Sequence, residues 1–309
     1  MMIKCWVAGV LLFLCSTLQA ADYAEATGGE SKVSVVVLED YHGLLDLYEQ
    51  LDYTDETWLA GDRHVPRLYL TSVPAQWGAE VSHAVTVALK KRLFFRTVGP
   101  LVLRSNELIL QDRKRLLGLS SRGDLPAEDK AWVRQLAEQY GVGEGALDDQ
   151  IKRLLHRVDV IPPSLILAQA AEESGWGTSR FAFEGNALFG QWTWGGNGIA
   201  PKGQRSGMGD YRIAAFESPL QSVRAHALNL NRHSAYAAFR ELRASQRDRG
   251  QSFTGLQAAT TLDKYSERGM DYVKSLQSII TFNKLQGTDD ALFADMRALV
   301  LVPADQASL

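Results

Sequence analysis

Residues 162–177 read PPSLILAQAAEESGWG, and the expected fold is built outward from them. Proline stands in the first helical turn and Gly175 stands just past the end, which is how α-helices commonly begin and end. The side chains between them are almost all apolar or small, a pattern that indicates a helix buried on most of its circumference. We therefore expect a core helix that runs to Glu173.

Two adjacent carboxylates, Glu172 and Glu173, occupy the end of this helix. Burial disfavours a charged carboxylate, and so does the partial negative charge at a helix C-terminus. Both effects raise the pKa, and a carboxyl group with a raised pKa is suited to general acid catalysis near neutral pH. A salt bridge to an arginine such as Arg180 is the structural alternative.

The residues after this helix predict a small β-lobe and then a return to helices. Residues 189–194 and 210–216 have the pattern of two short strands around a glycine-rich loop, and helical periodicity returns between residues 218 and 290. The expected fold class is α+β and mainly α. It comprises a helical lobe with a small β-hairpin lobe, preceded by a helical N-terminal arm.

Composition shifts divide the chain into five expected segments. Residues 1–20 have the positive start, apolar run and small-residue end of a secretory signal peptide. A polar leader is expected at 21–62, with a β-branched run at 33–38 and a small helix near 44–51. A helical region at 63–139, with a kink or a break expected at Gly99-Pro100, precedes the main domain at 140–290 and a tail at 291–309.

Charge and cysteine content exclude several classes of protein. The 33 basic and 36 acidic residues give a formal charge of -3, so the whole molecule has no electrostatic attraction to nucleic acid. Both cysteines, Cys5 and Cys15, lie in the expected signal, which leaves no disulfide and no cysteine metal ligand in the mature chain. No later apolar run is long enough for stable membrane insertion. We expect a soluble mature protein outside the cytoplasm, of undetermined oligomeric state.

Three further features have both a structural and a functional interpretation. Eight basic residues against two acidic ones between residues 90 and 115 predict a solvated helix face, or alternatively a patch for an anionic polymer. The glycines at 141–145 follow a helical pattern and not a strand, so they predict a turn and not a nucleotide site. His226 and His233 lie seven residues apart, but no carboxylate completes a metal site, and we expect helix-surface histidines.

The segment around Glu173 resembles a known enzyme family. Residues 168–179 read AQAAEESGWGTS, residues 186–190 read NALFG, and residues 272–280 read YVKSLQSII. These are similar to the AQAALESGWG-type helix end, the NLFG segment and the closing Tyr-x-x-Lys-Ile-x-x-Ile-Ile helix of the N-acetylglucosaminidases of glycoside hydrolase family 73. The resemblance covers roughly residues 140–285, and the whole chain resembles the Bax-type subgroup.

The resemblance implies a lysozyme-like fold that cuts the β-1,4 bond between N-acetylglucosamine and N-acetylmuramic acid in peptidoglycan. Glu173 matches the catalytic acid, the Glu directly before Ser-Gly-Trp-Gly, and would protonate the leaving glycosidic oxygen. Glu172 has no such match and is expected to modulate or pair with a charge. The implied partner is the glycan strand, without cofactor or metal, in the periplasm or secreted at the bacterial cell envelope.

The sequence departs from the family where a second carboxylate is often found in the β-lobe, because residues 189–209 hold no Asp or Glu. Asp210 is then the first candidate for the base that activates water, with Glu184 and Glu217 as alternatives. Such a base should lie about 6.5–9.5 Å from the acid. Substrate assistance by the 2-acetamido group would need no second carboxylate.

A second departure concerns the family's tyrosine pair, which corresponds here to Tyr265 and Tyr272 with one extra residue between them and no Asp-Pro. One of these phenols is expected to donate a hydrogen bond in the cleft, and packing in the core is the alternative.

Five residues of the matching segment are candidates for substrate binding. Trp192 and Trp194 stand two apart on an expected strand and so face one side, where flat rings can stack on sugars or pack the β-lobe onto the helices. Asn186 is expected either in a turn or as a hydrogen-bonding group of the cleft. Phe189 and Gln191 complete the set.

Two other functions remain open from the sequence. A lytic transglycosylase also acts with one glutamate on a lysozyme-like fold, but leaves a 1,6-anhydro product. A non-catalytic wall-binding protein could keep the fold without a second carboxylate. The position of Glu173 at an electrostatically unfavourable helix end favours catalysis.

Overall fold

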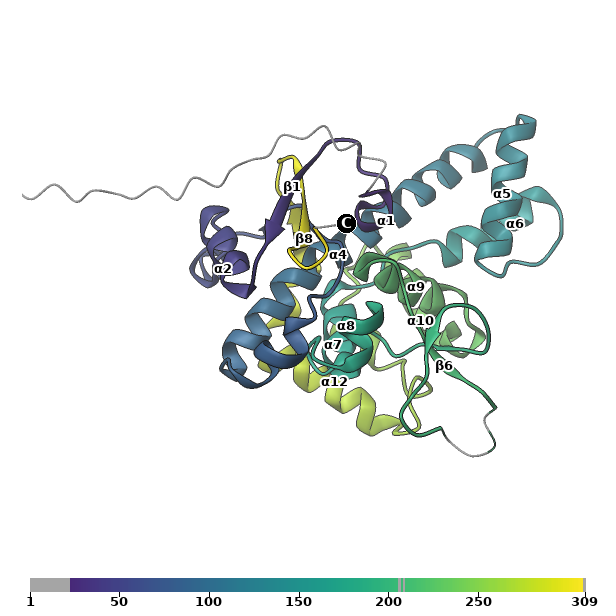
Figure 1. The fold of residues 1–309 in the computed structure, drawn as a ribbon. Coiled ribbons are helices and arrows are strands. Elements are labelled where there is room, and N and C mark those ends of the chain that lie inside the picture. Colours follow the sequence, from purple (N-terminus) through teal and green to yellow (C-terminus); the bar gives the residue numbers. More distant parts are fainter. Residues whose placement is uncertain (1–22, 205–206, 208, 308–309) are drawn as a thin grey trace, which may run out of the picture.

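The computed structural model describes residues 23–204, 207 and 209–307, and these form a mainly helical α+β fold (Figure 1). The fold class predicted from the sequence is confirmed. The expected signal peptide lies outside the described residues. Within the described part of the chain, no helix combines the length and apolar character needed to span a bilayer.

Helices account for most of the elements, and the strands are short. In chain order the helices are α1 (Ala24–Thr27), α2 (Tyr41–Gln50), α3 (Asp55–Leu59), η2 (Trp77–Val81), α4 (Val87–Ser120), α5 (Ala127–Gln139), α6 (Leu147–Arg157), α7 (Pro163–Ser174), α8 (Arg180–Gly185), α9 (Pro219–Arg232), η3 (Ser234–Tyr236), α10 (Ala237–Asp248), α11 (Gly255–Ala259), α12 (Met270–Phe282) and η4 (Leu285–Asp290). The strands are β1 (Val33–Leu38), β2 (His64–Val65), β3 (Leu68–Leu70), β4 (Trp192–Thr193), β5 (Gly198–Ile199), β6 (Arg212–Ala214), β7 (Leu292–Phe293) and β8 (Ala298–Pro303).

Helix α7 is the core helix that the sequence predicts, and residues 165–171 are at most 2% exposed. Gly175 ends it in the left-handed conformation, with φ of 58°, and donates its N–H to the Ala171 carbonyl. At the other end, the Asp289 carboxylate accepts from the backbone N–H groups of Ser164 and Gly255, each at 2.9 Å. One carboxylate of η4 therefore anchors the starts of both α7 and α11, which fixes the direction in which α7 presents its end.

The segments expected as a polar leader and a tail each contribute a strand to one sheet. Strand β8 lies between β1 and β3 in a parallel three-stranded sheet, with Val35 opposite Val300 and Leu70 opposite Leu301. Val300 is fully buried. Three short apolar runs far apart in sequence make this sheet together, and nothing in any one of them indicates its partner.

Of the kink or break expected at Gly99-Pro100, the break is wrong, because α4 runs continuously from Val87 to Ser120. A proline inside a helix removes one backbone hydrogen bond. Val98 and Leu101, on either side of Pro100, are 3% and 0% exposed. Burial of these neighbours against the core stabilises the continuous helix more than the missing bond destabilises it.

Part of the basic run on α4 is solvated as expected, since Arg92, Lys114 and Arg115 are exposed, but two of its arginines are not. Arg96 and Arg104 are buried, at 8% and 5% exposure. Arg96 pairs with Asp55 at 2.7 Å, and Arg104 donates to the Thr27 carbonyl at 2.9 Å. The guanidinium groups thus attach residues 23–62 to α4, which periodicity alone could not indicate.

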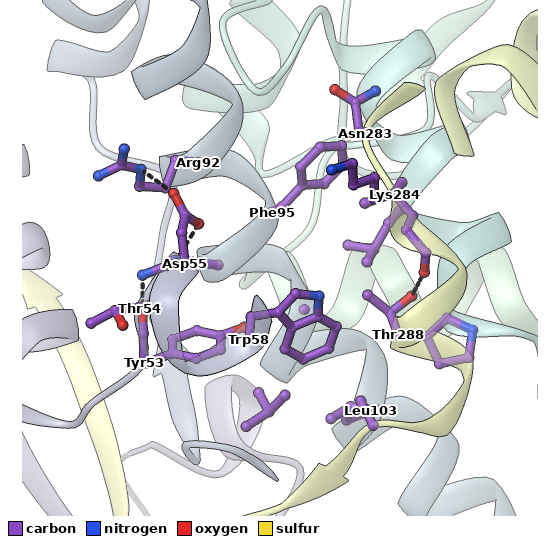
Figure 2. A pocket seen from close by; sticks show the side chains of 17 residues that line it. Tyr53, Thr54, Asp55, Trp58, Arg92, Phe95, Leu103, Asn283, Lys284 and Thr288 are labelled. Atoms are coloured by element: carbon purple, nitrogen blue, oxygen red, sulfur yellow. Dashed lines mark hydrogen bonds and ion pairs between the residues drawn. The ribbon is translucent and has the colours of Figure 1, made fainter. Parts of the chain in front are cut away.

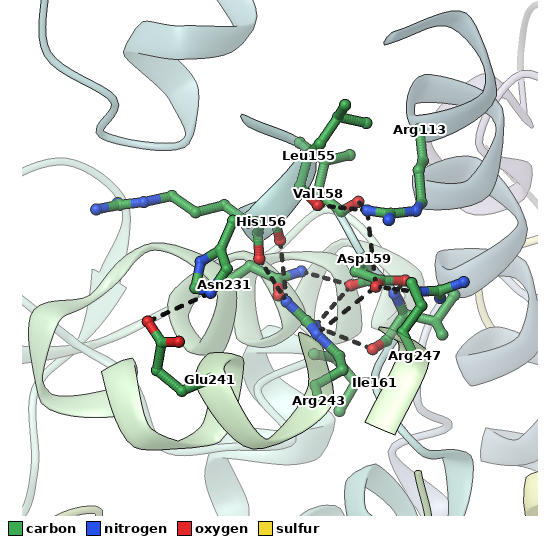
Figure 3. A network of polar contacts seen from close by, with 12 residues as sticks. Arg113, Leu155, His156, Val158, Asp159, Ile161, Asn231, Glu241, Arg243 and Arg247 are labelled. Carbon is green, nitrogen blue, oxygen red and sulfur yellow. Dashed lines mark hydrogen bonds and ion pairs between the residues drawn. The ribbon is translucent and has the colours of Figure 1, made fainter. Parts of the chain in front are cut away.

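A buried ion network holds the loop that leads into α7 (Figure 3). Asp159, which is 3% exposed, accepts from Arg247 at 2.5 and 2.7 Å. The Arg243 guanidinium donates to the carbonyls of Asp159 and Val160, and burial lowers its pKa to about 10. Arg113 of α4 donates to the Val158 carbonyl at 3.0 Å. Helices α4 and α10 are therefore tied to residues 158–160, three residues before α7 begins.

Candidate active site

A cleft of about 600 Å³ opens beside the end of α7. It lies between Glu173, the segment that enters the β-lobe, and the loop between α11 and α12. The residues that line it are Glu173, Phe189, Gly190, Gln191, Trp192, Asn229, Tyr236, Tyr265, Ser266, Glu267 and Arg268. The structure therefore brings Glu173, Tyr265, Phe189, Gln191 and Trp192 together as the sequence predicts.

Glu173 lines this cleft and has a hydrogen-bond partner in the core. The hydroxyl of Tyr272 donates to its Oε1 at 2.9 Å. Burial of the carboxyl group raises its pKa, the negative charge of Glu172 raises it further, and the Tyr272 hydrogen bond and Arg268 act in the opposite direction. A proton held tightly beside an open cleft is the property that a general acid requires.

Glu172 points away from this position although it precedes Glu173 in the chain. Its carboxylate pairs with Arg268 at 2.5 Å and accepts from the Ser275 hydroxyl at 3.1 Å. The expected pairing with a charge is therefore present, and its partner is Arg268. Arg180, proposed as a structural partner for the helix end, instead pairs with Glu184 at 2.9 Å.

The ring of Tyr265 stacks on the ring of Tyr272. The rings of Tyr265 and Tyr272 are parallel within 4°, with centroids 5.2 Å apart. Tyr272 is 1% exposed, and burial raises its pKa far above the usual value for a phenol, so its hydroxyl keeps its proton. Tyr272 is the phenol that donates to Glu173, and Tyr265 forms the wall.

His226 is fully buried, which corrects the expectation of a helix-surface histidine. Its ring stacks on Phe189 with a centroid distance of 3.9 Å and an angle of 3°. Burial lowers the pKa of His226 to about 3, so the ring is neutral. Its Nε2 lies 3.0 Å from Oε1 of Gln169 on α7. Helical spacing placed His226 on one face of α9 but could not show that this face is inward.

The two tryptophans of the β-lobe differ in position. Trp192 stacks on Tyr211 at 4.4 Å and lines the cleft, whereas Trp194 meets Trp192 edge to face at 6.0 Å and is 65% exposed. Trp194 is not among the lining residues.

Asn186 holds the fold and does not line the cleft, which corrects its place among the substrate-binding candidates. Its Oδ1 accepts from the Val73 backbone N–H at 2.8 Å, and its Nδ2 donates to the Phe216 carbonyl at 3.0 Å. Both ends of the amide are used within the protein. Asn186 connects the N-terminal region to the β-lobe.

The carboxylates suggested as water-activating bases also lie outside the set that lines the cleft. The Asp210 side chain is 74% exposed and accepts from Gln204 at 2.8 Å. Glu217 is exposed, and Glu184 is paired with Arg180. The β-lobe pattern identified a strand start at Asp210 but gave no measure of where its side chain points.

Glu267 was missed by the sequence analysis and lines the cleft together with Glu173. Among the described residues it is the second carboxylate of that lining set. The signal was present, because Glu267 stands two residues after Tyr265 in the matched tyrosine segment. Arg268 follows it and brings a guanidinium group to the same wall.

A separate apolar cavity of about 150 Å³ lies between α3, α4 and η4 (Figure 2). Trp58 and Phe95 line it, and Asp55 at its wall pairs with Arg92 at 3.3 Å and with Arg96. Glu173 is not among its lining residues. Over the described ranges, no group of three or more His, Cys, Asp or Glu side chains is arranged to hold a metal ion.

Comparison with known proteins assigns the domain that contains Glu173. Residues 148–285 match the family model named Glucosaminidase, described as mannosyl-glycoprotein endo-beta-N-acetylglucosaminidase. The chain carries a glucosaminidase-family domain. This family consists of glycoside hydrolases, and the matched residues include all the described elements from α7 to α12.

Two individual proteins are similar to this chain. Protein bax of Escherichia coli (strain K12) is 35% identical over 185 residues, which covers 59% of this chain and 66% of that protein. The chain therefore spans just under two thirds of the length of this relative. The catalytic domain of the autolysin Auto from Listeria monocytogenes aligns in structure with a TM-score of 0.33 and 21% identity, covering 57% of this chain and 96% of that domain.

Proposed function

We propose that the protein is a peptidoglycan hydrolase, an endo-β-N-acetylglucosaminidase that cuts the β-1,4 bond between N-acetylglucosamine and N-acetylmuramic acid. The observation that carries this proposal is a half-buried glutamate, held by a buried tyrosine, that lines a cleft in a glucosaminidase-family domain. A peptidoglycan substrate supports the proposal that the protein acts in the periplasm or outside the cell.

In the proposed reaction Glu173 is the general acid. Its proton moves to the glycosidic oxygen as the bond from that oxygen to the anomeric carbon breaks, and positive charge develops on the sugar ring. The Tyr272 hydroxyl remains a donor to Glu173 and stabilises the carboxylate that is left. Water then adds to the anomeric carbon, and its proton must pass to a base.

We assign that base to Glu267 in preference to Asp210, because Glu267 lines the same cleft as Glu173. A carboxylate that faces the acid across the sugar can accept the proton of the attacking water. The 2-acetamido group of the substrate is the alternative nucleophile. The aromatic rings of Trp192 and Tyr265 offer flat apolar faces to sugar rings.

Digestion of purified peptidoglycan with the wild-type protein and with Glu173→Gln tests this proposal. Borohydride reduction of the products should yield N-acetylglucosaminitol from the wild-type digest and none from the variant. N-acetylmuramitol would indicate a muramidase instead, and 1,6-anhydro ends without a reducing sugar would indicate a lytic transglycosylase. Binding of peptidoglycan without any cleavage would identify a wall-binding protein.

A further inference from the structure

We infer that His226, Gln169 and Tyr272 form a relay of directed hydrogen bonds that makes Oε1 of Glu173 an acceptor and leaves the acidic proton on Oε2. His226 and Gln169 are then positioning residues, since neither lines the cleft. This inference rests on the proposed role of Glu173 and adds the device that orients its proton.

The relay consists of three consecutive contacts inside the core. His226 Nε2 lies 3.0 Å from Gln169 Oε1, Gln169 Nε2 lies 3.3 Å from the Tyr272 hydroxyl, and that hydroxyl lies 2.9 Å from Glu173 Oε1. His226 and Gln169 are 0% exposed and Tyr272 is 1% exposed. Gln169 and Glu173 are four residues apart on α7 and so share one face of the helix.

A glutamine amide gives such a chain a direction, because its nitrogen only donates and its oxygen only accepts. With Nε2 toward Tyr272, the tyrosine oxygen accepts from Gln169 and its single hydrogen is left for Glu173. With the amide reversed, Tyr272 would donate to Gln169, and Glu173 would have to donate to Tyr272. The two directions require different tautomers of His226.

The surroundings of His226 select between these tautomers. The neutral ring carries one proton, and Nδ1 is buried without a hydrogen-bond partner among the described residues. A proton on Nδ1 would leave an N–H donor unsatisfied, whereas a proton on Nε2 donates to Gln169 and leaves only a lone pair unused. Buried N–H groups without partners are rarer than under-used acceptors. The ring plane is held by stacking on Phe189.

The selected direction has a chemical consequence at Glu173. Oε1 accepts from Tyr272 whether the carboxyl group is charged or neutral, so the acidic proton resides on Oε2. The same bond favours the carboxylate and opposes the rise in pKa that burial causes. Disruption of the relay should therefore raise the pKa of Glu173 further.

The charged and titratable groups that face Glu173 come from several elements and remain in place in the test variants. They are Glu172 of α7, Tyr236 of η3, Tyr265, Glu267 and Arg268 of the loop before α12, and Tyr272.

Carbon-13 NMR titration of carboxyl-labelled glutamate tests the relay, with the Glu173 resonance assigned by its loss in Glu173→Gln. Gln169→Met keeps the length of the side chain but removes both polar atoms. We expect the pKa of Glu173 to rise by about half to one unit in this variant. Gln150→Met is the matched control, since Gln150 is a buried glutamine of α6 that bonds to the Gly143 carbonyl. It should leave the titration unchanged.

Two further measurements keep the test decisive if Gln169→Met does not fold. His226→Phe retains a ring against Phe189 and should raise the pKa of Glu173 by a smaller amount. Nitrogen-15 chemical shifts of histidine in the wild-type protein should show that His226 is protonated at Nε2 and unprotonated at Nδ1. A proton on Nδ1, or an unchanged Glu173 titration in a folded Gln169→Met, would overturn the relay. Neither readout depends on cleavage, so failure of the proposed hydrolysis would be recognised separately.

Discussion

Glu172 and Glu173 are neighbours on one helix and end in opposite surroundings. The Glu172 carboxylate is paired with Arg268 and Ser275, while the Glu173 carboxyl group is half-buried and receives the Tyr272 hydroxyl. Two consecutive helical residues point about 100° apart. That divergence gives one glutamate an arginine partner and leaves the other in buried surroundings that raise its pKa.

Exchange of each glutamate for glutamine should separate these roles. Glu173→Gln should abolish peptidoglycan cleavage, because the amide keeps the shape of the side chain and cannot deliver a proton. Glu172→Gln should retain activity within about tenfold, which corresponds to about 1.4 kcal/mol in the barrier. Reducing-end release measures both. The opposite result, with Glu172→Gln inactive and Glu173→Gln active, would assign the acid to Glu172.

Relative to the wild type, the Glu173→Gln variant should become more stable as the pH rises. Folding raises the pKa of Glu173 through burial, so between the unfolded and folded pKa values the folded chain holds a proton that the unfolded chain has lost. The free energy of unfolding therefore falls through that window as pH increases, and the loss is complete above the folded pKa. Glutamine is neutral at every pH, so the free energy of unfolding of the variant does not fall for this reason.

Urea denaturation at two pH values checks this sign. Near pH 8 the variant should unfold at a higher urea concentration than the wild type. At about pH 4, below the usual pKa of an unfolded glutamate, the difference should shrink or vanish. Glu172→Gln is the control, because it removes a carboxylate that is ion-paired. A Glu173→Gln variant less stable than the wild type near pH 8 would contradict a raised pKa.

The choice of base can be tested with Glu267 and Asp210 side by side. Glu267→Gln should lower turnover by roughly 10² to 10⁴, the usual contribution of a positioned base. Asp210→Asn should have little effect, because its side chain is largely exposed and outside the cleft lining. Turnover on solubilised glycan strands, with binding measured separately, compares the two. If both variants remain active, the 2-acetamido group of the substrate is left as the nucleophile.

The sequence predicted best what is local. Helix α7, its end at Gly175 and the position of Glu173 in its last turn follow from periodicity, capping residues and a twelve-residue motif, all within one segment. A long-range contact was predicted only where the family pattern supplied it, as for Tyr272. Glu267 and the buried His226 depend on how a loop and a helix face pack against α7, and no local pattern records that packing.

The terminal segments illustrate the same limit on a larger scale. Residues 33–38 and 298–303 are separated by most of the chain, yet they are adjacent strands of one sheet. Each segment is a short apolar run, but neither run indicates which other segment it pairs with. Asn186, far from both strands in the sequence, accepts from the backbone N–H of Val73, three residues after β3.

We therefore expect the sheet at the chain ends to contribute to the stability of the whole protein. Leu301 of β8 is 1% exposed and pairs with Val36 and Leu70, whereas Leu292 of β7 is 65% exposed. Leu301→Ala should lower the free energy of unfolding by about 2–5 kcal/mol, the usual cost of emptying a buried leucine site. Leu292→Ala makes the same chemical change at the surface and should alter the free energy of unfolding by no more than about 0.5 kcal/mol.

Chemical denaturation followed by tryptophan fluorescence measures both variants. A single transition that shifts in Leu301→Ala would show that the terminal sheet unfolds together with the cleft, and two separate transitions, with only one shifted, would show that it does not.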